Sequence, residues 1–313
     1  LRCGMGDDAA LLETAGRGEM VLTTDLLLEK VHFRLDWTPP ELLGHKALSV
    51  NLSDLAAMGA EPEVFLLELG LPPAWPVAAL EAFLAGMDRL ARRVSIALAG
   101  GDVSASGRLH IGVTAVGRVE PGRALRRRGA QPGDDLAVTG PLGAAGAGYQ
   151  LLQEGFRLAG KTVKRPLGAK GQGRLNTPAL SRLLRAHLAP EAELEAGWAL
   201  ATVARAGLDL SDGLGQDLPT LCEASGLGAE VFRSAIPVNQ EARLFWESRG
   251  RDPIVEALAA GEDYHLLVAL PPEASWHGPG KLARIGRLTA RAEVRLVEDA
   301  GWRPWPRTGF QHF

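Results

Sequence analysis

Six short acidic motifs recur along this sequence, and together they offer the residue types that bind metal ions. Two unit negative charges about 4 Å apart repel by roughly 4 kcal/mol at an effective dielectric constant of 20. Carboxylates gathered in one cleft therefore need protons or cations to stay together. Divalent metal ions are the predicted partners. In chain order, the motifs are Gly6-Asp7-Asp8-Ala9, Thr23-Thr24-Asp25, Ser53-Asp54-Leu55, Gly100-Gly101-Asp102, Asp209-Leu210-Ser211-Asp212 and Gly261-Glu262-Asp263-Tyr264.

Each motif also has a purely structural interpretation. The motif at residues 6–9 alone is typical of a surface turn, and the one at 209–212 is typical of a helix N-cap. Residues 23–25 offer two hydroxyls and a carboxylate, hard ligands suited to Mg²⁺, whereas residues 100–102 leave backbone room for a phosphate beside a carboxylate. A cap or turn explains any one motif equally well, but so many acids at predicted strand exits favour a shared site.

The elements expected around these motifs place them at the ends of strands and on one helix. Residues 20–23 predict a strand that ends on Asp25, and residues 94–99 predict another that ends on Asp102. Residues 45–58 predict a helix that ends at Gly59, a typical C′ residue. On this helix Asp54 shares a mostly apolar stripe, where an ionised carboxylate is unfavourable without a partner.

Turn signals between residues 120 and 135 indicate a domain boundary. Pro121-Gly122 and Pro132-Gly133 lie there, and we place the boundary near Gly129, between domains at 1–129 and 130–313. Alternating strands and helices predict an α/β fold for both domains. The further predicted elements are strands at 63–69, 109–119, 135–139 and 265–270, helices at 77–91, 178–188, 254–260 and from 214, and a surface loop at 161–176.

The composition excludes several classes of protein. With 313 residues and 46% hydrophobic content, the chain can form two domains of ordinary size. A net charge of −3 gives no reason to expect nucleic acid or membrane partners. No apolar stretch approaches the roughly 20 residues of a membrane span, and no secretion signal is evident. Cys3 and Cys222 fit a reducing compartment, so a soluble cytoplasmic protein is expected; the start at Leu1 leaves open a missing N-terminal segment.

Two further patterns carry competing interpretations. Residues 155–162 match the Walker A expression, but a P-loop follows a buried strand and opens a helix. Residues 149–154 instead favour a helix, and later prolines and glycines oppose another one, so we discount the match. The arginine run 126–128 fits a solvated linker or a clamp on nucleotide phosphates, and the overall acidity makes a nucleic-acid patch the least favoured interpretation. No histidine ligand pair or nucleophile triad is evident.

Taken together, the motifs resemble the thiamine-monophosphate kinase family, within the aminoimidazole-ribotide-synthetase-like superfamily. The acidic pair is shared across the superfamily, whereas the Val-His-Phe segment, the block at 51–60 and the closing His-Phe favour the kinases. The segments that carry the resemblance are Gly6-Asp7-Asp8-Ala9-Ala10, Thr23-Thr24-Asp25 with Glu29, Val31-His32-Phe33, Asn51-Leu52-Ser53-Asp54-Leu55-Ala56-Ala57-Met58-Gly59-Ala60, Gly100-Gly101-Asp102, Leu208-Asp209-Leu210-Ser211-Asp212-Gly213-Leu214, Gly261-Glu262-Asp263-Tyr264 and Gly309-Phe310-Gln311-His312-Phe313.

The resemblance implies an ATP-dependent enzyme that phosphorylates thiamine monophosphate to thiamine diphosphate by direct in-line transfer, assisted by several Mg²⁺ ions and without a general base. It also implies a two-domain fold in which domain 1–129 binds metal and ATP and pairs its sheet across the two-fold axis of a homodimer. The implied metal ligands are Asp8, Thr23, Thr24, Asp25, Asp54, Asp102, Asp209 and Asp212. The implied ATP contacts are Gly101, Asp102, Arg127 and Ser211, and the implied thiamine contacts are His32, Glu262 and Phe310.

The sequence departs from the family pattern at a few positions, none of them an implied metal ligand. Lys30 replaces a usual glycine, His265 stands where glutamate is frequent, and Ala189 and Glu193 replace residues that are usually basic. These changes concern fine contacts of the C-terminal domain. Two alternatives stay open: another ATP-dependent member of the superfamily, of the selenophosphate or aminoimidazole-ribotide synthetase type, or a non-catalytic protein that binds nucleotide or divalent ions.

Overall fold

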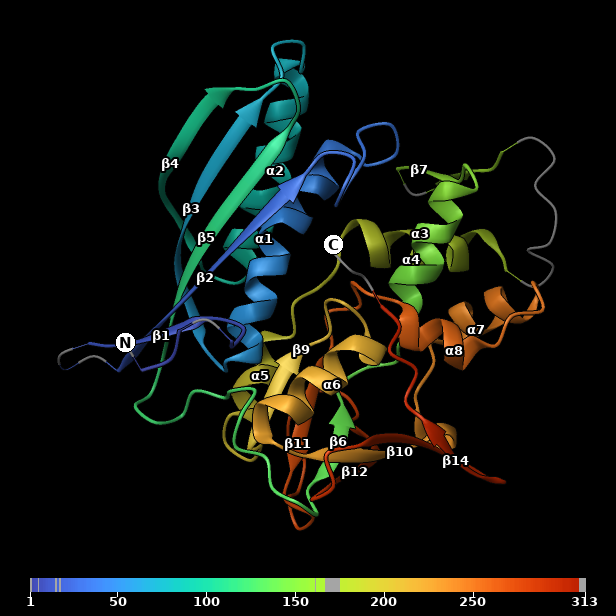
Figure 1. The fold of residues 1–313 in the computed structure, drawn as a ribbon. Helices are drawn as coiled ribbons and strands as arrows, with labels where there is room; N and C mark the ends of the chain where they lie inside the picture. Colours follow the sequence, from blue (N-terminus) through green and yellow to red (C-terminus); the bar gives the residue numbers. More distant parts are fainter. Residues whose placement is uncertain are drawn as a thin grey trace.

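A computed structural model describes residues 2–4, 6–14, 16, 18–160, 162–166 and 175–309 of the chain. Two large sheets, each with its own helices, make up most of the molecule (Figure 1). The first sheet lies within the first 119 residues and the second begins at residue 135. The predicted α/β fold class is therefore confirmed, whereas the boundary near Gly129 stays a prediction.

The N-terminal sheet has five strands in the order β1-β2-β5-β3-β4, with only the β3–β4 pair parallel. Helices α1 and α2 cover one face, and side chains of that face, such as Val21, Phe65 and Val113, are buried. On the opposite face Leu26 and Leu66 are exposed, because successive strand residues point to opposite sides. The strands are β1 (Ala10–Glu13), β2 (Glu19–Leu28), β3 (Glu61–Leu71), β4 (Ala97–Ala105) and β5 (His110–Val119), and the helices are α1 (Pro40–Ala57) and α2 (Val77–Arg93).

The predicted ends of two strands were wrong. Asp25 lies inside β2 and Asp102 inside β4, because both strands continue past their acidic motifs. Strand β5 pairs with β2 over residues 19–28, so the backbone ladder does not stop at the acid. On its other side β2 pairs with β1 over residues 19–22, and within the described ranges no strand pairs with the second half of this edge.

Helix α1 is buried on nearly all sides and touches α2 through backbone. A Cβ atom at Gly44 would lie 1.9 Å from the Phe83 carbonyl oxygen, and one at Gly86 would lie 1.8 Å from that of Glu41. Only glycine permits this approach. The predicted end of the helix is confirmed, since Gly59 adopts φ +69° just after it, but the helix begins earlier than predicted, at Pro40.

The C-terminal half is built on a seven-stranded sheet in the order β14-β13-β10-β12-β6-β11-β9. Its strands are β6 (Asp135–Val138), β9 (Ala206–Asp209), β10 (Gly228–Phe232), β11 (Leu266–Leu270), β12 (Ala283–Thr289), β13 (Val294–Glu298) and β14 (Gly301–Pro304). The helices are α3 (Ala144–Gln153), α4 (Thr177–Leu188), α5 (Leu194–Leu200), α6 (Leu214–Ser225), α7 (Gln240–Glu247) and α8 (Pro253–Ala259), with one 3-10 turn, Arg233–Ala235.

The two halves share a core. Helix α5 packs against α1 so closely that a Cβ atom at Gly197 would lie 2.1 Å from the Ala56 carbonyl oxygen. Buried residues of α5 and β11 belong to the same apolar cluster as the N-terminal sheet. Their close packing holds α1 firmly between the sheets, where it carries Asp54.

The Walker A match does not have the setting of a P-loop, as predicted. Helix α3 precedes it, and the segment itself contributes to a small hairpin of β7 (Arg157–Ala159) and β8 (Thr162–Lys164). Its lysine, Lys161, and most of the predicted loop at 161–176 lie outside the described residues. Among the helices of the described ranges, none combines the length and apolar character that crossing a membrane requires.

Candidate metal centre and substrate cavity

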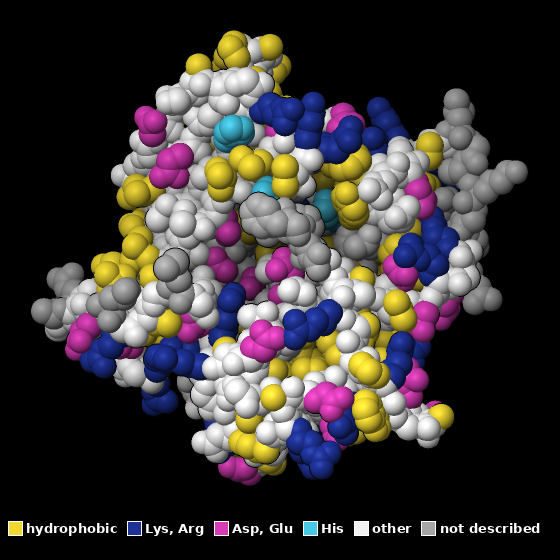
Figure 2. All heavy atoms as spheres, viewed as in Figure 1, with side chains coloured by type: hydrophobic (Ala, Val, Ile, Leu, Met, Phe, Trp, Pro, Cys, Tyr) yellow, Lys and Arg dark blue, Asp and Glu magenta, His cyan; other side chains and the backbone are white. Residues whose placement is uncertain are grey.

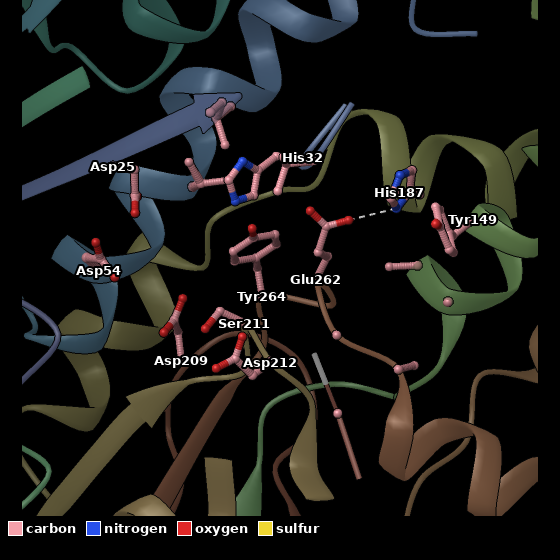
Figure 3. Close-up of a pocket in the computed structure, with 18 of the residues that line it drawn as sticks. Asp25, His32, Asp54, Tyr149, His187, Asp209, Ser211, Asp212, Glu262 and Tyr264 are labelled. Carbon is pink, nitrogen blue, oxygen red and sulfur yellow. Dashed lines mark ion pairs between the residues drawn. The ribbon is translucent and has the colours of Figure 1, made fainter. Parts of the chain in front are cut away.

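A cavity of about 670 Å³ lies where the two halves of the molecule meet. Figure 2 shows acidic side chains inside a hollow at the centre of one face, with histidines above them. In the close-up, carboxylates from β2, α1 and the β9–α6 segment occupy one side of the cavity. Glu262, His187 and Tyr149 occupy the other side (Figure 3). The cavity therefore has an acidic end and a second end where one carboxylate lies beside a histidine and a tyrosine.

Three carboxylates form the centre of the acidic end. Asp8, Asp54 and Asp209 each offer an oxygen, and these oxygens lie within 4.8 Å of one another. They come from the N-terminal segment, from the buried helix α1 and from the end of β9, so distant parts of the chain converge here. Neighbouring hydroxyls orient two of them: Ser53 Oγ donates to Asp209 at 2.6 Å, and the Thr23 hydroxyl donates to Asp54.

Burial and mutual repulsion raise the pKa values of these carboxyls. Burial raises the pKa of Asp8 to about 7, with Asp209 adding to the shift and Arg127 opposing it. Burial also raises the pKa of Asp54 well above its ordinary value, and Asp25, Asp209 and Asp8 raise it further. The pKa of Asp25 rises to about 6 for the same two reasons, burial and Asp209. Without cations, ionisation of one of these carboxyls makes ionisation of its neighbours less favourable.

The cluster fits hard divalent cations. One buried oxygen, Asp8 Oδ2, accepts no hydrogen bond within the described part of the chain. An orphaned carboxylate oxygen beside two other carboxylates is unfavourable by itself but matches an all-oxygen ligand set. Mg²⁺ prefers such ligands, and its charge would relieve the repulsion between them.

Arg127 faces this cluster instead of solvent. Its Nη2 lies 2.6 Å from Asp8 Oδ1, and its backbone N–H donates to Asp7 at 2.8 Å. About a quarter of its side chain, 27%, is exposed. Of the interpretations left open for the arginine run, a solvated linker does not describe Arg127.

Asp212 and Ser211 also line the cavity, in the segment that joins β9 to α6. The N-cap of α6 is Gly213, with φ +101°, and not one of the acids. Asp217, which the sequence analysis missed, holds this segment by accepting hydrogen bonds from the backbone N–H groups of Asp212 and Gly213 at 3.1 and 2.9 Å. Asp217 lies four residues after the N-cap Gly213, so the pattern is not a capping box, and no established sequence signal singled this residue out.

Thr24 and Asp102 lie apart from the acidic cluster. Thr24 points to the outer face of the N-terminal sheet, where its hydroxyl is 3.1 Å from that of Thr114. Asp102 lies on the exposed strand β4, opposite Glu68, with β5 and β3 between it and β2. Thr24 also borders the cavity, but its hydroxyl lies on the face of β2 opposite to Asp25, and Asp102 lies three strands away. The metal roles of both residues stay predictions.

Gly101 has a structural reason to be glycine. It pairs with Leu67 in the parallel β3–β4 ladder, beside a register shift. A Cβ atom there would lie 1.9 Å from the Leu67 carbonyl oxygen. The close strand pairing explains the residue without a nucleotide, and its predicted contact with ATP stays a prediction.

Glu262 is the carboxylate at the second end of the cavity. Its Oε1 lies 2.8 Å from Lys46 Nζ and its Oε2 lies 2.8 Å from His187 Nδ1. Burial alone would raise the pKa of Glu262, but Lys46 and then His187 outweigh it, so the pKa lies below its usual range. His32 also lines the cavity, and its Nδ1 accepts a hydrogen bond from the Leu28 N–H at 3.0 Å. Phe310, the third predicted thiamine contact, lies outside the described residues.

Sequence reasoning missed Lys46, His187 and Tyr149. The Tyr149 ring is 43% exposed and lies 5.2 Å from that of His187, which gives this end an aromatic wall. Lys46 lies on the same apolar helix as Asp54. A charge on such a helix is unfavourable without a partner, so the sequence predicts a partner for Lys46 as it does for Asp54. For His187 and Tyr149 no pattern in the sequence was available.

The chain is similar to known proteins over almost its whole length. Residues 6–119 match the N-terminal domain of AIR synthase related proteins, and residues 131–299 match the C-terminal domain. The thiamine-monophosphate kinase of Escherichia coli is 36% identical over 99% of this chain and 91% of its own length. That of Mycobacterium tuberculosis is 34% identical over 99% of this chain and 85% of its own length.

A solved structure described as AaThiL complexed with AMPPCP and TMP superposes with a TM-score of 0.86. It is 33% identical and covers 99% of this chain and 92% of that chain. Full-length identity at this level, together with both domain matches, establishes common descent and a common fold. The chain belongs to the thiamine-monophosphate kinase family, within the AIR synthase related proteins.

Proposed function

We infer that this protein transfers the γ-phosphoryl group of ATP to the phosphate of thiamine monophosphate, forming thiamine diphosphate and ADP. One observation carries the proposal: a single cavity joins the Asp8, Asp54 and Asp209 cluster to the carboxylate of Glu262. Two phosphate-bearing molecules placed end to end need cations where their phosphates meet and a separate site for the organic group. Kinases of this name among the relatives support the choice of acceptor.

The acidic end would hold the metal ions. Asp8, Asp54 and Asp209 are the central ligands, and Asp25 and Asp212 border the same part of the cavity. When bound, several Mg²⁺ ions neutralise the charge on the phosphate oxygens that meet during the transfer. The chain itself orients these ligands through Ser53, the Thr23 hydroxyl and the Asp217 carboxylate.

The acceptor requires little chemical activation. An oxygen of its phosphate, already anionic, forms the new bond to the γ-phosphorus while the bond to the bridging oxygen of ADP breaks, in line. No proton has to be removed from the acceptor, so no general base is assigned. The contribution of the protein is alignment: His32 and Glu262 border the space for the thiamine group, and the cavity keeps the two substrates in register.

A coupled assay for ADP release tests this function. We expect Mg²⁺-dependent ADP release with thiamine monophosphate, no release with free thiamine or without an acceptor, and thiamine diphosphate as the product identified by chromatography. Release with free thiamine but not with the monophosphate contradicts the acceptor. ATP binding without any turnover points to the non-catalytic alternative.

The proposed enzyme is a cytoplasmic homodimer. Two apolar side chains are exposed on the outer face of the N-terminal sheet, Leu26 at 57% and Leu66 at 39%, and two more are exposed on its edge strand β4, Leu98 at 53% and Val103 at 63%. A second copy seated on the outer face of this sheet would cover part of this apolar surface. It would also bring Asp102 near the second half of β2, where Thr24 and Leu26 border the cavity.

Mixed dimers test whether Asp102 acts across this interface. We expect Asp102→Asn and Asp54→Asn each to be inactive alone. After the two variants are mixed and allowed to exchange subunits, each heterodimer would contain one intact site, so about a quarter of wild-type activity should return for random pairing. No recovery, although energy transfer between differently labelled variants shows that the subunits exchange, contradicts a role of Asp102 in the partner's site.

A further inference from the structure

A fully buried lysine lies behind the second end of the cavity. Only 1% of the Lys46 side chain is exposed, in the middle of α1. Its Nζ lies 2.8 Å from Glu262 Oε1 and donates to the His187 carbonyl oxygen at 3.2 Å. The His187 ring contacts the other carboxylate oxygen, with Nδ1 at 2.8 Å from Oε2 (Figure 3). Two side chains from different helices thus hold the two oxygens of one carboxylate.

The three side chains differ in how much of each is exposed. Glu262 exposes 26% of its side chain, whereas His187 exposes 8% and Lys46 only 1%. A molecule in the cavity therefore meets the carboxylate first, while Lys46 lies behind it and the mostly buried His187 lies beside it at the cavity wall. Because a buried ammonium without a partner is strongly unfavourable, Lys46 keeps Glu262 ionised and close.

The backbone of the Glu262 loop is also held in an uncommon conformation. Glu262 has φ +63° and Tyr264 has φ +53°, in the left-handed region that side chains other than glycine rarely adopt. Backbone N–H groups of these two residues bond to carbonyl oxygens of residues 210–211 at 2.8 and 3.0 Å. The Asp263 carboxylate accepts from backbone N–H groups at the start of α3. Strain of this kind persists where the surroundings fix one conformation, as they do at binding sites.

From these contacts we propose that Lys46 and His187 are positioning residues, which fix the Glu262 carboxylate in the orientation that receives the thiamine group of the acceptor. The inference rests on the proposed function and deepens it. Helix α1 carries both Lys46 and Asp54, so the same rigid element sets the distance between the carboxylate that receives the acceptor and the acidic end. Neither residue has to touch a substrate to act in this way.

Steady-state kinetics of matched variants test the positioning role. Lys46→Met removes the ammonium and keeps the apolar stem, and Lys281→Met, at an exposed lysine, is the control. We expect Lys46→Met to raise the KM for thiamine monophosphate by about tenfold or more, since a hydrogen bond to a charged group is lost. The KM for ATP should stay within about twofold. Equal increases for both substrates would show a general structural defect and overturn the proposal.

A pair of histidine variants keeps the test informative if Lys46→Met does not fold. His187→Asn retains an N–H donor close to the position of Nδ1, whereas His187→Leu removes it. We expect the leucine variant to raise the KM for thiamine monophosphate and the asparagine variant to recover most of the loss. An unchanged KM in the leucine variant overturns the role of His187.

Two measurements separate this inference from the proposed function. Calorimetric titration with thiamine monophosphate compares affinities without turnover, so an inactive wild type that still binds it overturns the kinase assignment alone. In denaturant unfolding, the double variant Lys46→Met with Glu262→Gln should be more stable than Lys46→Met, because it leaves no unpaired buried charge. A double variant that is less stable, with unchanged affinity for thiamine monophosphate, overturns the positioning role alone.

Discussion

Asp54→Asn is expected to abolish turnover, with kcat lowered by about a thousandfold or more, because a central metal ligand loses its charge. Asparagine has nearly the same shape and keeps one oxygen for the Thr23 hydroxyl, so the buried helix α1 is undisturbed. The measurement is ADP release in the coupled assay. Asp88→Asn is the matched control, since Asp88 lies exposed on α2 and pairs with Arg92.

The same substitution is expected to stabilise the metal-free protein at pH 8. Burial and then Asp25, Asp209 and Asp8 raise the pKa of Asp54, so the folded state binds its proton more tightly than the unfolded state. The stabilisation that comes from protonated Asp54 is complete below the ordinary pKa of aspartate. It is lost as the pH rises toward the pKa of Asp54 in the folded state. Asparagine has no proton to lose.

Thermal unfolding in EDTA checks this expectation. At pH 8 the Tm of Asp54→Asn should exceed that of the wild type by an amount on the order of 5 °C, and the gap should narrow toward pH 5. Added Mg²⁺ should raise the Tm of the wild type more than that of the variant. A variant with the lower Tm at pH 8 in EDTA contradicts the charge crowding inferred for the cluster.

Gly86→Ala is expected to lower the free energy of unfolding by about 3 kcal/mol or more, through forced separation of two helices. The new Cβ would lie 1.8 Å from the Glu41 carbonyl oxygen, so α1 and α2 must move apart. In a helix interior alanine is by itself favoured over glycine by about 1 kcal/mol. A net loss of stability would therefore mean that the backbone clash costs more than alanine gains in helix propensity.

Denaturant unfolding measures this effect, with Gly107→Ala as the control. No heavy atom would lie within 4 Å of a Cβ at Gly107, so that variant should unfold like the wild type. A shift of α1 also moves Asp54 and Lys46, so Gly86→Ala should weaken Mg²⁺ and thiamine monophosphate binding together. Unchanged stability of Gly86→Ala would mean that the helices adjust at little cost.

The longer helices and the strands β2, β3, β4, β5, β6 and β11 were predictable from the sequence. Helix α2 follows the apolar spacing after Pro76, and α1 ends at Gly59, because both signals act between residues within one or two turns. The elements that the sequence analysis missed are the strands β1, β7, β8, β9, β10, β12, β13 and β14 and the helices α5 and α7. Most of these elements are short. Strand β10 depends on pairing with β12 and β13, which are distant in the sequence, whereas β14 pairs with its sequence neighbour β13.

The acidic motifs identified the chemistry of the site but not its geometry. Thr24 and Asp25 are neighbours in one motif, yet they point to opposite faces of β2 because the strand continues through them. Asp102 looked equivalent to Asp25 in the sequence, since both followed a predicted strand, but the strand order β2-β5-β3-β4 places it on the far side of the sheet. Strand order depends on long-range pairing, which no local pattern encodes.

By itself, the sequence of this protein determined the family, the oxygen-rich ligand chemistry and the larger helices, since motifs and apolar spacing are local properties. Only the tertiary structure decided that Asp8, Asp54 and Asp209 share a centre, and that Lys46 and His187 hold Glu262. Partners such as Lys46 and Glu262 are more than 200 residues apart in the chain. Packing of α1 between the two sheets brings them together, because a charged side chain on the buried helix is unfavourable without a partner.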